Sequence, residues 1–359
     1  MSDAPVSAAV AIAAARELAD ELKRNPPLPV KAVALGGGHG LHASLSALRL
    51  LTDDVTAVVT VADDGGSSGR IRRELKVLPP GDLRMALAAL AGHDPEHDEW
   101  ADLLQHRIGG HGVLAGHPVG NLILTAMLER DNDPVRALER LGTLVGAVGR
   151  VLPMSPVPLD LVGEADRFDP DDPSRTRKIR GQVSIATTPG RVRSISLLPN
   201  GAPACADAVD AVREADLVLL GPGSWFTSVI PHLLLRELGK TLASTSARLV
   251  VVLNLVPQLG ETDAYEPHEL LALLQTHAEP FGGLPIHTVL ADTDSVLDRQ
   301  DLSRYTRAIG ARLVVSRLAA DDSAERHDPV RLSQALRTVL AEADERDDER
   351  PRGGTDAWR

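Results

Sequence analysis

Residues 59–82 read VTVADDGGSSGRIRRELKVLPPGD, an apolar strand that gives way to two aspartates and then to glycines, serines and Arg70. A strand that ends in acidic residues places carboxylates at the carboxyl edge of a sheet, where α/β proteins bind their ligands. The glycines that follow permit positive φ angles and leave backbone N–H groups free, which is how an anion-binding nest is built. This stretch therefore predicts a ligand site on an α/β fold.

The polar side chains of the same stretch have complementary roles toward a phosphate. Ser67 and Ser68 can donate hydrogen bonds to phosphate oxygens, and Arg70 can grip a phosphate with its planar guanidinium. Asp63 and Asp64 would repel a bare phosphate, so they indicate Mg²⁺ or ligand hydroxyl groups. The stretch therefore favours a phosphorylated ligand that carries hydroxyl groups or brings Mg²⁺.

Composition limits the class of protein. The chain has 359 residues, of which 43% are hydrophobic and 2% aromatic, and its formal net charge is -12. Such a chain can fill a large core, but its charge and its few aromatic residues argue against nucleic acid as a partner. Its one cysteine, Cys205, excludes an internal disulfide and a cysteine-based zinc site. The apolar run at residues 8–22 contains charges and lacks a basic leading region, so we expect no signal peptide, no membrane span and a cytoplasmic protein.

The pattern along the chain predicts an α/β fold with a largely parallel sheet. Its first βαβ unit consists of a strand at residues 31–35, a glycine turn at 36–40, a helix at 41–51 and a strand at 55–61. Helices follow from Asp82, and β-rich pieces between Gly149 and Leu198 predict an antiparallel insertion. Parallel order then resumes with strands at 216–220, 248–253, 286–290 and 312–315 and with helices at 225–238 and 329–342.

The chain divides into three parts. We expect an N-terminal extension, helical or frayed, at residues 1–29, and an α/β domain at residues 30–343 with an inserted segment at about 82–200. The charged run DERDDER then begins a disordered acidic tail at residues 344–359.

The sequence GGGHGLHAS after the first strand is a candidate phosphate site. Gly38, Gly40 and Ala43 have the G-x-G-x-x-A spacing of dinucleotide-binding turns, directly after a strand and at the start of a helix. Gly37 adds a backbone N–H, and Asp63 lies 23 residues beyond Gly40, where an acid can hold a ribose hydroxyl. The turn therefore predicts phosphate or nucleotide binding; the alternative is a tight turn that needs glycine for packing alone.

A second junction between a strand and a helix carries the sequence GPGS at residues 221–224. Helix N-termini bind phosphates through free N–H groups and the helix dipole. Pro222 has no N–H, so Gly223, Ser224 and Trp225 are the expected contacts. A plain helix cap at Ser224 is the alternative.

Two asparagines are candidates for amide contacts with a ligand. Asn254 follows a buried strand, and its amide could read a base or a hydroxyl group. Gln258, Glu261 and Thr262 in the same loop are equally consistent with an ordinary polar loop. Asn121, in the sequence HPVGN, either caps a helix or contacts the ligand.

A hydrolase is a minor rival to a binding protein. Gly65, Ser67 and Gly69 match the G-x-S-x-G motif of the hydrolase nucleophile elbow. Asp63 and Asp64 crowd the serine in the sequence, and no smooth strand-turn-helix unit is expected after it. The motif therefore does not decide the function.

Two further patterns favour structural explanations. Five histidines between His93 and His117 suggest a metal site, but a loop-rich surface segment explains them as well. Asp292 and Asp294 resemble the D-x-D motif of sugar-nucleotide transferases, although two aspartates in a turn after a strand are common. We assign a site to neither pattern.

Seven separated motifs agree on one family. In chain order they are GGGHG, TVADDGGSSGR, PPGD with Arg84, HPVGN, GPGS with Thr227 and Ser228, NLVPQLGETDAY and DPVRL, and they span about residues 30–340. In this order and spacing they resemble the gluconeogenesis-factor (YvcK-like) branch of the YvcK/CofD-like family, which also contains the 2-phospho-L-lactate transferases. The resemblance implies a Rossmann-like α/β sheet with an inserted helical and β subdomain, a cytoplasmic protein and a homodimer.

The two branches of that family imply two functions. One is tied to growth on gluconeogenic carbon sources, cell shape and peptidoglycan supply, and binds UDP-sugars with no established turnover. The other transfers a phospholactyl group from an activated nucleotide donor with Mg²⁺. We expect the first, a UDP-sugar-binding regulatory protein rather than an enzyme. In the alternative transferase, Asp63, Asp64 and Arg70 would be catalytic, with the aspartates on Mg²⁺ and the arginine on the charge of the transition state.

The expected site follows from these motifs. The two glycine turns and Ser224 would cradle a diphosphate, the aspartates would hold sugar or ribose hydroxyls directly or through Mg²⁺, and Asn254 would read the base. The expected ligand-binding residues are Gly37, Gly38, Gly40, Asp63, Asp64, Ser67, Ser68, Arg70, Asn121, Gly223, Ser224 and Asn254, with Asp63 and Asp64 as Mg²⁺ ligands. A nicotinamide-dependent oxidoreductase also fits the first glycine turn, but no histidine or tyrosine is placed as its proton relay.

Overall fold

The computed structural model describes residues 25–348, except for residues 93, 169–171, 173, 259, 297 and 298. The predicted N-terminal extension lies outside the described residues up to residue 24. The predicted tail lies outside them from residue 349.

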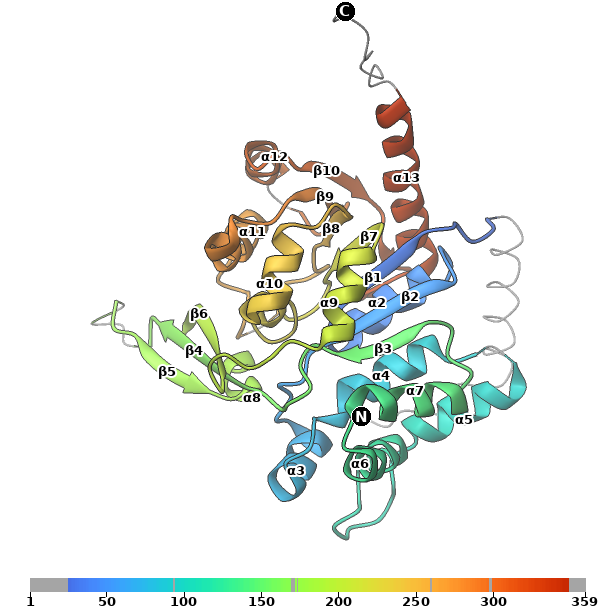
Figure 1. The fold of residues 1–359 in the computed structure, drawn as a ribbon. Coiled ribbons are helices and arrows are strands. Elements are labelled where there is room, and N and C mark those ends of the chain that lie inside the picture. The colour runs from blue at the N-terminus through green and yellow to red at the C-terminus, as the bar shows by residue number, and fades with distance from the viewer. Residues whose placement is uncertain are drawn as a thin grey trace, which may run out of the picture.

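Seven parallel strands form the central sheet, in the order β10-β9-β8-β7-β1-β2-β3 (Figure 1). They are β1 (Lys31–Gly36), β2 (Asp54–Val59), β3 (Arg150–Pro153), β7 (Leu217–Leu220), β8 (Arg248–Val252), β9 (Ile286–Asp292) and β10 (Arg312–Ser316). The chain order reverses between β1 and β7, and ligands of open α/β sheets bind at the carboxyl edge beside such a reversal. The predicted Rossmann-like α/β fold is confirmed, and both glycine turns follow the two strands at the reversal.

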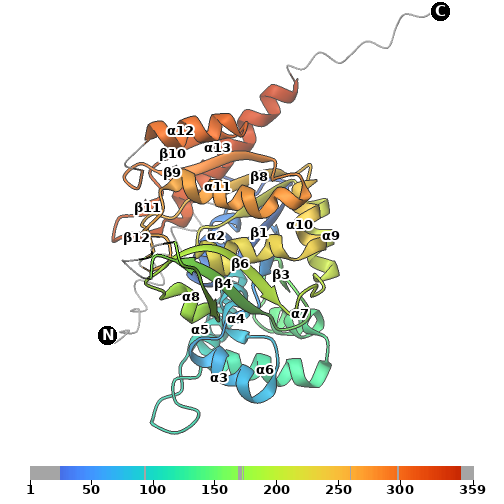
Figure 2. The ribbon, with the colours of Figure 1, turned by 90° about the vertical axis from the view of Figure 1, so that its left-hand side faces the viewer.

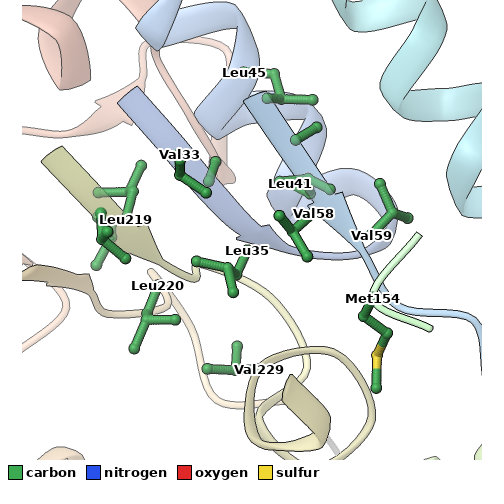
Figure 3. Packing of buried hydrophobic residues seen from close by; sticks show 14 of the residues in the cluster. Val33, Leu35, Leu41, Leu45, Val58, Val59, Met154, Leu219, Leu220 and Val229 are labelled. Atoms are coloured by element: carbon green, nitrogen blue, oxygen red, sulfur yellow. The ribbon is translucent and has the colours of Figure 1, made fainter. Parts of the chain in front are cut away.

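The strands are runs of valine, leucine and alanine because helices cover both faces of the sheet. Leu35, Val58 and Leu219 lie on three different strands and are each exposed by 1% or less. Leu41 and Leu45 enter the same core from α2 (Gly38–Leu48), the helix that follows β1 (Figure 3). Full burial of one such side chain stabilises the fold by about 2 kcal/mol.

The segment between β2 and β3 is helical and forms a layer beyond the β3 end of the sheet (Figures 1 and 2). It contains α3 (Gly66–Leu75), α4 (Pro80–Leu90), α5 (Pro95–Gln105), α6 (Val119–Asp131) and α7 (Pro134–Leu144). The later helices are α9 (Ala206–Glu214), α10 (Arg236–Ala243), α11 (Pro267–Ala278), α12 (Arg299–Ala308) and α13 (Pro329–Asp348). In the described part of the chain, no helix combines the length and the apolar character that crossing a membrane requires.

The antiparallel insertion is smaller than predicted. A three-stranded sheet with the order β5-β4-β6 is built from β4 (Asp160–Asp166), β5 (Arg177–Arg180) and β6 (Arg191–Leu198), with the short helix α8 (Gln182–Ala186) beside it. Strand β3, which we expected in this insertion, instead pairs in parallel with β2 at the edge of the central sheet. A strand of four residues is too short for its sequence pattern to distinguish the two arrangements.

Three other elements differ from the sequence prediction. The glycine and serine run after β2 leads into a helix where we expected no strand-turn-helix unit, because α3 begins at Gly66. The helix expected at residues 225–238 is divided into a π-helical turn at Trp225–Val229, a 3-10 helix at Ile230–Leu234 and α10. α13 continues to Asp348, so residues 344–348 are helical where we expected a tail. The sequence also gave no sign of the hairpin of β11 (Ala319–Ala320) and β12 (Ser323–His327) or of the 3-10 turn at Glu279–Phe281.

Candidate functional site

The glycine turn after β1 lies too close to other segments to accept side chains. A Cβ on Gly37 would lie 2.5 Å from Oδ2 of Asp82, and a Cβ on Gly40 would overlap the carbonyl oxygen of Pro222. Gly38 begins α2 with a φ of +57°, a conformation that favours glycine. The turn therefore brings the N-terminus of α2 against both the GPGS turn and an acidic side chain.

The second glycine turn, after β7, is held by Asn254. Oδ1 of Asn254 accepts a hydrogen bond from the N–H of Gly223 at 2.8 Å, and Nδ2 donates to the carbonyl oxygen of Gly223 at 2.9 Å. Both polar atoms of this side chain bond the backbone, so Asn254 positions the turn, and its expected contact with a base stays a prediction. Oγ of Ser224 accepts from the N–H of Thr227 at 3.0 Å and donates to Glu261, so Ser224 acts as a cap.

Asp63 has two acidic neighbours, since the charge of Asp64 acts on Asp63 and the charge of Asp63 acts on Asp82. Burial raises the pKa of Asp63, and burial together with the charge of Asp63 raises the pKa of Asp82 to about 7. Each carboxylate also accepts a backbone hydrogen bond, Asp63 from Gly65 at 2.9 Å and Asp82 from Gly38. Two carboxyl groups in one site titrate as a pair, so this pair retains a proton near neutral pH unless a cation joins it.

Asp64 and Arg70 hold neighbouring loops. Oδ1 of Asp64 accepts a hydrogen bond from the N–H of Val183 in α8 at 3.0 Å, which fastens the antiparallel insertion to the end of β2. The guanidinium of Arg70 donates to the carbonyl oxygens of Ala115 at 3.0 Å and Val113 at 3.5 Å. These contacts are with the protein itself, and the ligand contacts that we expected of Asp64 and Arg70 stay predictions.

The acidic pair suits Mg²⁺ that arrives with a phosphate. Oγ1 of Thr60, beside Gly37 and Asp82, is buried without a hydrogen-bond partner in the described part of the chain. Within those residues, no three histidine, cysteine or acidic side chains converge as a metal site. Mg²⁺ commonly takes one or two carboxylates and completes its shell with water and phosphate oxygens. The residues present therefore fit a Mg²⁺ ion that a carboxylate of Asp63 or Asp82 would hold together with ligand phosphates. The histidine pattern forms no such cluster, and His93 lies outside the described residues.

A chain of polar contacts links α3, α4 and α6. Nε of Arg84 donates to Oδ1 of Asn121 at 2.9 Å, Nδ2 of Asn121 donates to Oγ of Ser67 at 2.9 Å, and that oxygen lies 2.7 Å from Nδ1 of His117. Ser68 is separate from this chain, since its Oγ accepts from the N–H of Gly81 at 3.0 Å. The structure therefore brings Ser67 and Asn121 together, and it adds Arg84 and His117.

Arg84 is the buried cation of the site. Its side chain is 4% exposed, and Nη1 has no hydrogen-bond partner among the described residues. Burial lowers the pKa of Arg84 to about 10, so the guanidinium is charged at neutral pH. A buried cation with an unused donor is suited to an anion.

An open cavity of about 660 Å³ adjoins both glycine turns at the carboxyl edge of the sheet. Its lining residues include His327 and Gln258, whose Nε2 and Oε1 atoms are buried without a hydrogen-bond partner in the described part of the chain. Burial lowers the pKa of His327 to about 4, so its ring is neutral. The lining residues are His39, Gly40, Ala43, Pro222, Gly223, Asn254, Leu255, Val256, Pro257, Gln258, Ser323, Glu325, Arg326 and His327.

The predicted site residues did not include Asp82, Arg84, His117 or His327, although the family motifs contain the first three. Asp82 was the easiest of these residues to predict from the sequence, because PPGD places an acid in the first turn of a helix that begins with proline. Asp292, to which we assigned no site, accepts hydrogen bonds from the N–H groups of Leu318 and Ala319 within the fold.

The comparisons with known proteins agree on one family. The family model described as 2-phospho-L-lactate transferase CofD matches residues 32–336. A Mycobacterium tuberculosis protein named "Putative gluconeogenesis factor" is 51% identical over 91% of this chain and 98% of its own length. The gluconeogenesis factor of Bacillus subtilis is 36% identical over 75% of this chain and 80% of its own length.

The fold is shared with a solved structure. A UPF0052-family protein of Bacillus halodurans is 30% identical and superposes with a TM-score of 0.76, over 86% of this chain and 99% of its own. The chain therefore belongs to the CofD/YvcK family, in the branch whose members are named gluconeogenesis factors.

Proposed function

We propose that the protein is a UDP-sugar-binding regulatory protein of the gluconeogenesis-factor type, whose ligand lies across the carboxyl edge between the two glycine turns. The family branch supports this proposal. On the same ground the protein acts in the cytoplasm as a homodimer and supports cell shape and peptidoglycan supply on gluconeogenic carbon sources.

The observation that carries the proposal is the contact between the two glycine turns beside an open cavity. Gly40 packs against the Pro222–Gly223 backbone so closely that a Cβ there would overlap it. The N–H groups at the start of α2 lie at this junction, where the helix dipole favours a diphosphate. The cavity of about 660 Å³ falls within the range of small-molecule sites.

The cavity wall supports a nucleobase beside the diphosphate. The neutral ring of His327 bonds the carbonyl of Leu253 and leaves Nε2 free as a hydrogen-bond acceptor. Gln258 contributes a free acceptor oxygen and an amide donor group. A uracil ring presents an N–H group between two carbonyl oxygens, so His327 and Gln258 take the role that we expected for Asn254.

The acidic pair gives a specific reason to keep a second candidate, a Mg²⁺-dependent transferase of the 2-phospho-L-lactate transferase type. Asp63 and Asp82 would hold Mg²⁺ against the phosphates of a nucleotide donor, and the ion would neutralise charge on the transferred group. Arg84 would then contact the developing charge in the place that we expected for Arg70.

A thermal-shift screen tests the choice. The wild type is heated with UDP-sugars, UDP, GDP, NAD and NADP, each with and without Mg²⁺, because a ligand that binds the folded state raises Tm. UDP-sugars should give the largest rise. A rise that requires Mg²⁺ and guanine nucleotides would favour the transferase, and no response to any nucleotide sugar would refute the regulatory proposal.

A pair of variants localises the response. Gln258→Ala, in the cavity wall, should weaken UDP-sugar affinity about tenfold, the loss of one good hydrogen bond. Arg248→Ala is the control, since it lines a cavity of about 530 Å³ at the opposite, amino edge of the sheet and should leave affinity unchanged.

A further inference from the structure

Ser67 lies in a hydrogen-bond arrangement that binding alone does not require. Its Oγ is 2.7 Å from Nδ1 of His117 and accepts a hydrogen bond from Nδ2 of Asn121 at 2.9 Å. The orientation of the Asn121 amide is fixed, because Nε of Arg84 can only donate and therefore faces Oδ1. Nδ2 must then be the atom that donates to Ser67.

The direction of the Ser67 proton follows from these contacts. Its oxygen is already an acceptor from Asn121, and within the described residues its hydrogen has no partner other than Nδ1 of His117. The burial of the imidazole and the charge of Arg70 lower the pKa of His117, so the ring is neutral at pH 7 and can accept that proton. The serine hydroxyl is therefore polarised toward a base.

The backbone around Ser67 also differs from what we expected. Strand β2 is followed by a turn and then by α3 from Gly66, so the G-x-S-x-G motif does lie in a strand-turn-helix unit. The aspartates do not crowd the serine, because Asp63 bonds Gly65 and Asp64 bonds Val183. Unlike the nucleophile of a hydrolase elbow, Ser67 lies within the first helical turn, where backbone N–H groups can stabilise negative charge.

We propose that Ser67 is a nucleophile, activated by His117, toward phosphate esters or anhydrides. Oγ forms a bond to phosphorus as the bond to the leaving oxygen breaks, and the serine proton passes to Nδ1 of His117 and then to the leaving group. The free Nη1 of Arg84, next to Asn121 in the same network, favours an anionic phosphoryl group over a neutral acyl group. This inference does not rest on UDP-sugar binding, and either can fail without the other.

Labelling with a fluorophosphonate tests the nucleophile without knowledge of the substrate. The probe phosphonylates activated serines with loss of fluoride, and intact mass followed by peptide mapping counts and locates the adduct. We expect one adduct on wild-type protein, at Ser67, and none on Ser67→Ala. No adduct on folded wild type, or an adduct at another residue, would overturn the proposal, and this part needs no variant that might misfold.

The role of the base is tested by labelling rates. His117→Gln should label at least a hundredfold more slowly, the range that general-base catalysis contributes. Ser46→Ala and His106→Asn are matched controls and should label like the wild type. Oγ of Ser46 lies 3.4 Å from Nδ1 of His42 but donates to the His42 carbonyl oxygen at 2.9 Å, and His106 is exposed. An unchanged rate in His117→Gln with an unchanged Tm would refute the activation.

Discussion

Asn254 and Gly223 are joined by two hydrogen bonds, in which Oδ1 of the side chain accepts from the Gly223 N–H at 2.8 Å and Nδ2 donates to the Gly223 carbonyl oxygen at 2.9 Å. The asparagine at the end of β8 thereby fixes the turn after β7, although the two residues are 31 positions apart. The shape of the proposed diphosphate cradle therefore depends on a side chain whose two polar atoms both bond the backbone of Gly223.

Asn254→Ala should lower the affinity for every nucleotide ligand by the same factor, because it loosens the turn that all of them share. We expect a loss of about tenfold and of about 1–2 kcal/mol in the free energy of unfolding. Calorimetric titrations with UDP-sugar, UDP and GDP measure both the factor and the base preference. A changed base preference would show that Asn254 reads the base after all.

Gly40→Ala should destabilise the protein by about 2–4 kcal/mol, since its Cβ would meet the backbone of Pro222, which cannot move aside like a flexible side chain. Gly109→Ala is the matched control, because a Cβ there has no atom within 4 Å. Urea unfolding of the two variants measures the difference. Equal stability would mean that the two turns do not pack as closely as the structure has them.

Arg84→Met should weaken the binding of phosphorylated ligands at least tenfold, because it removes the buried donor Nη1 and its charge. Arg73→Met removes a charge from an exposed position on α3 and should have little effect. Inorganic pyrophosphate is a suitable probe, since it lacks the base and the sugar. If both variants bind pyrophosphate like the wild type, the phosphates lie elsewhere.

Asp82 should make the stability of the metal-free protein fall with rising pH. Its pKa is about 7 in the folded state against an ordinary value of 3.8, so the folded protein holds a proton that the unfolded chain has lost. The stabilising contribution of that proton is present at low pH and disappears as pH rises through about 7. Urea unfolding of the wild type and Asp82→Asn at pH 5 and pH 8 should show the wild type losing stability relative to the variant.

The control for that experiment is Asp53→Asn, an exposed position, which should follow the wild type at both pH values. Mg²⁺ together with a nucleotide should reverse the loss at pH 8 in the wild type alone, because the ion favours the deprotonated pair. Parallel pH profiles for wild type and Asp82→Asn would contradict the acidic pair.

Asp64→Ala should loosen the insertion with little effect on ligand affinity. The variant loses the hydrogen bond from the Val183 N–H, at a cost of about 1 kcal/mol, whereas Asp64→Asn keeps an acceptor oxygen and should behave like the wild type. Faster hydrogen exchange in α8 of Asp64→Ala would report the loosening. A large loss of affinity in Asp64→Asn would restore Asp64 to the ligand site.

Much of the fold could be predicted because its strands are continuous apolar runs separated by glycine turns. The stretch 248–253, which contains β8, and the glycine turn before α2 are visible in the sequence alone. Strand β3 was assigned to the wrong sheet because the RVLP sequence pattern is the same for either sheet, and only its pairing with β2 decides. A local sequence pattern therefore predicts the presence of a strand more reliably than it predicts which strand it pairs with.

The same limit explains the site. The sequence motifs identified the segments that form the candidate site. The contacts of each side chain in that site, however, depend on hydrogen-bond partners from distant segments of the chain. The N–H of Val183 donates to Asp64, and Arg70 donates to the carbonyl oxygen of Ala115. The charge of Asp63, in the loop after β2, acts on Asp82 in the first turn of α4. Arg84 belongs to a family motif in the sequence, but its burial becomes apparent only when α4 is packed against α6.

The most direct test of the central claim is a crystal structure of the wild type with a UDP-sugar and Mg²⁺. We predict that the diphosphate lies on the N–H groups at the start of α2 and the Gly223 turn, with the base in the cavity beside His327 and Gln258. A nucleotide bound at the amino edge of the sheet, near Arg248, or no bound nucleotide at saturating concentration, would contradict the account.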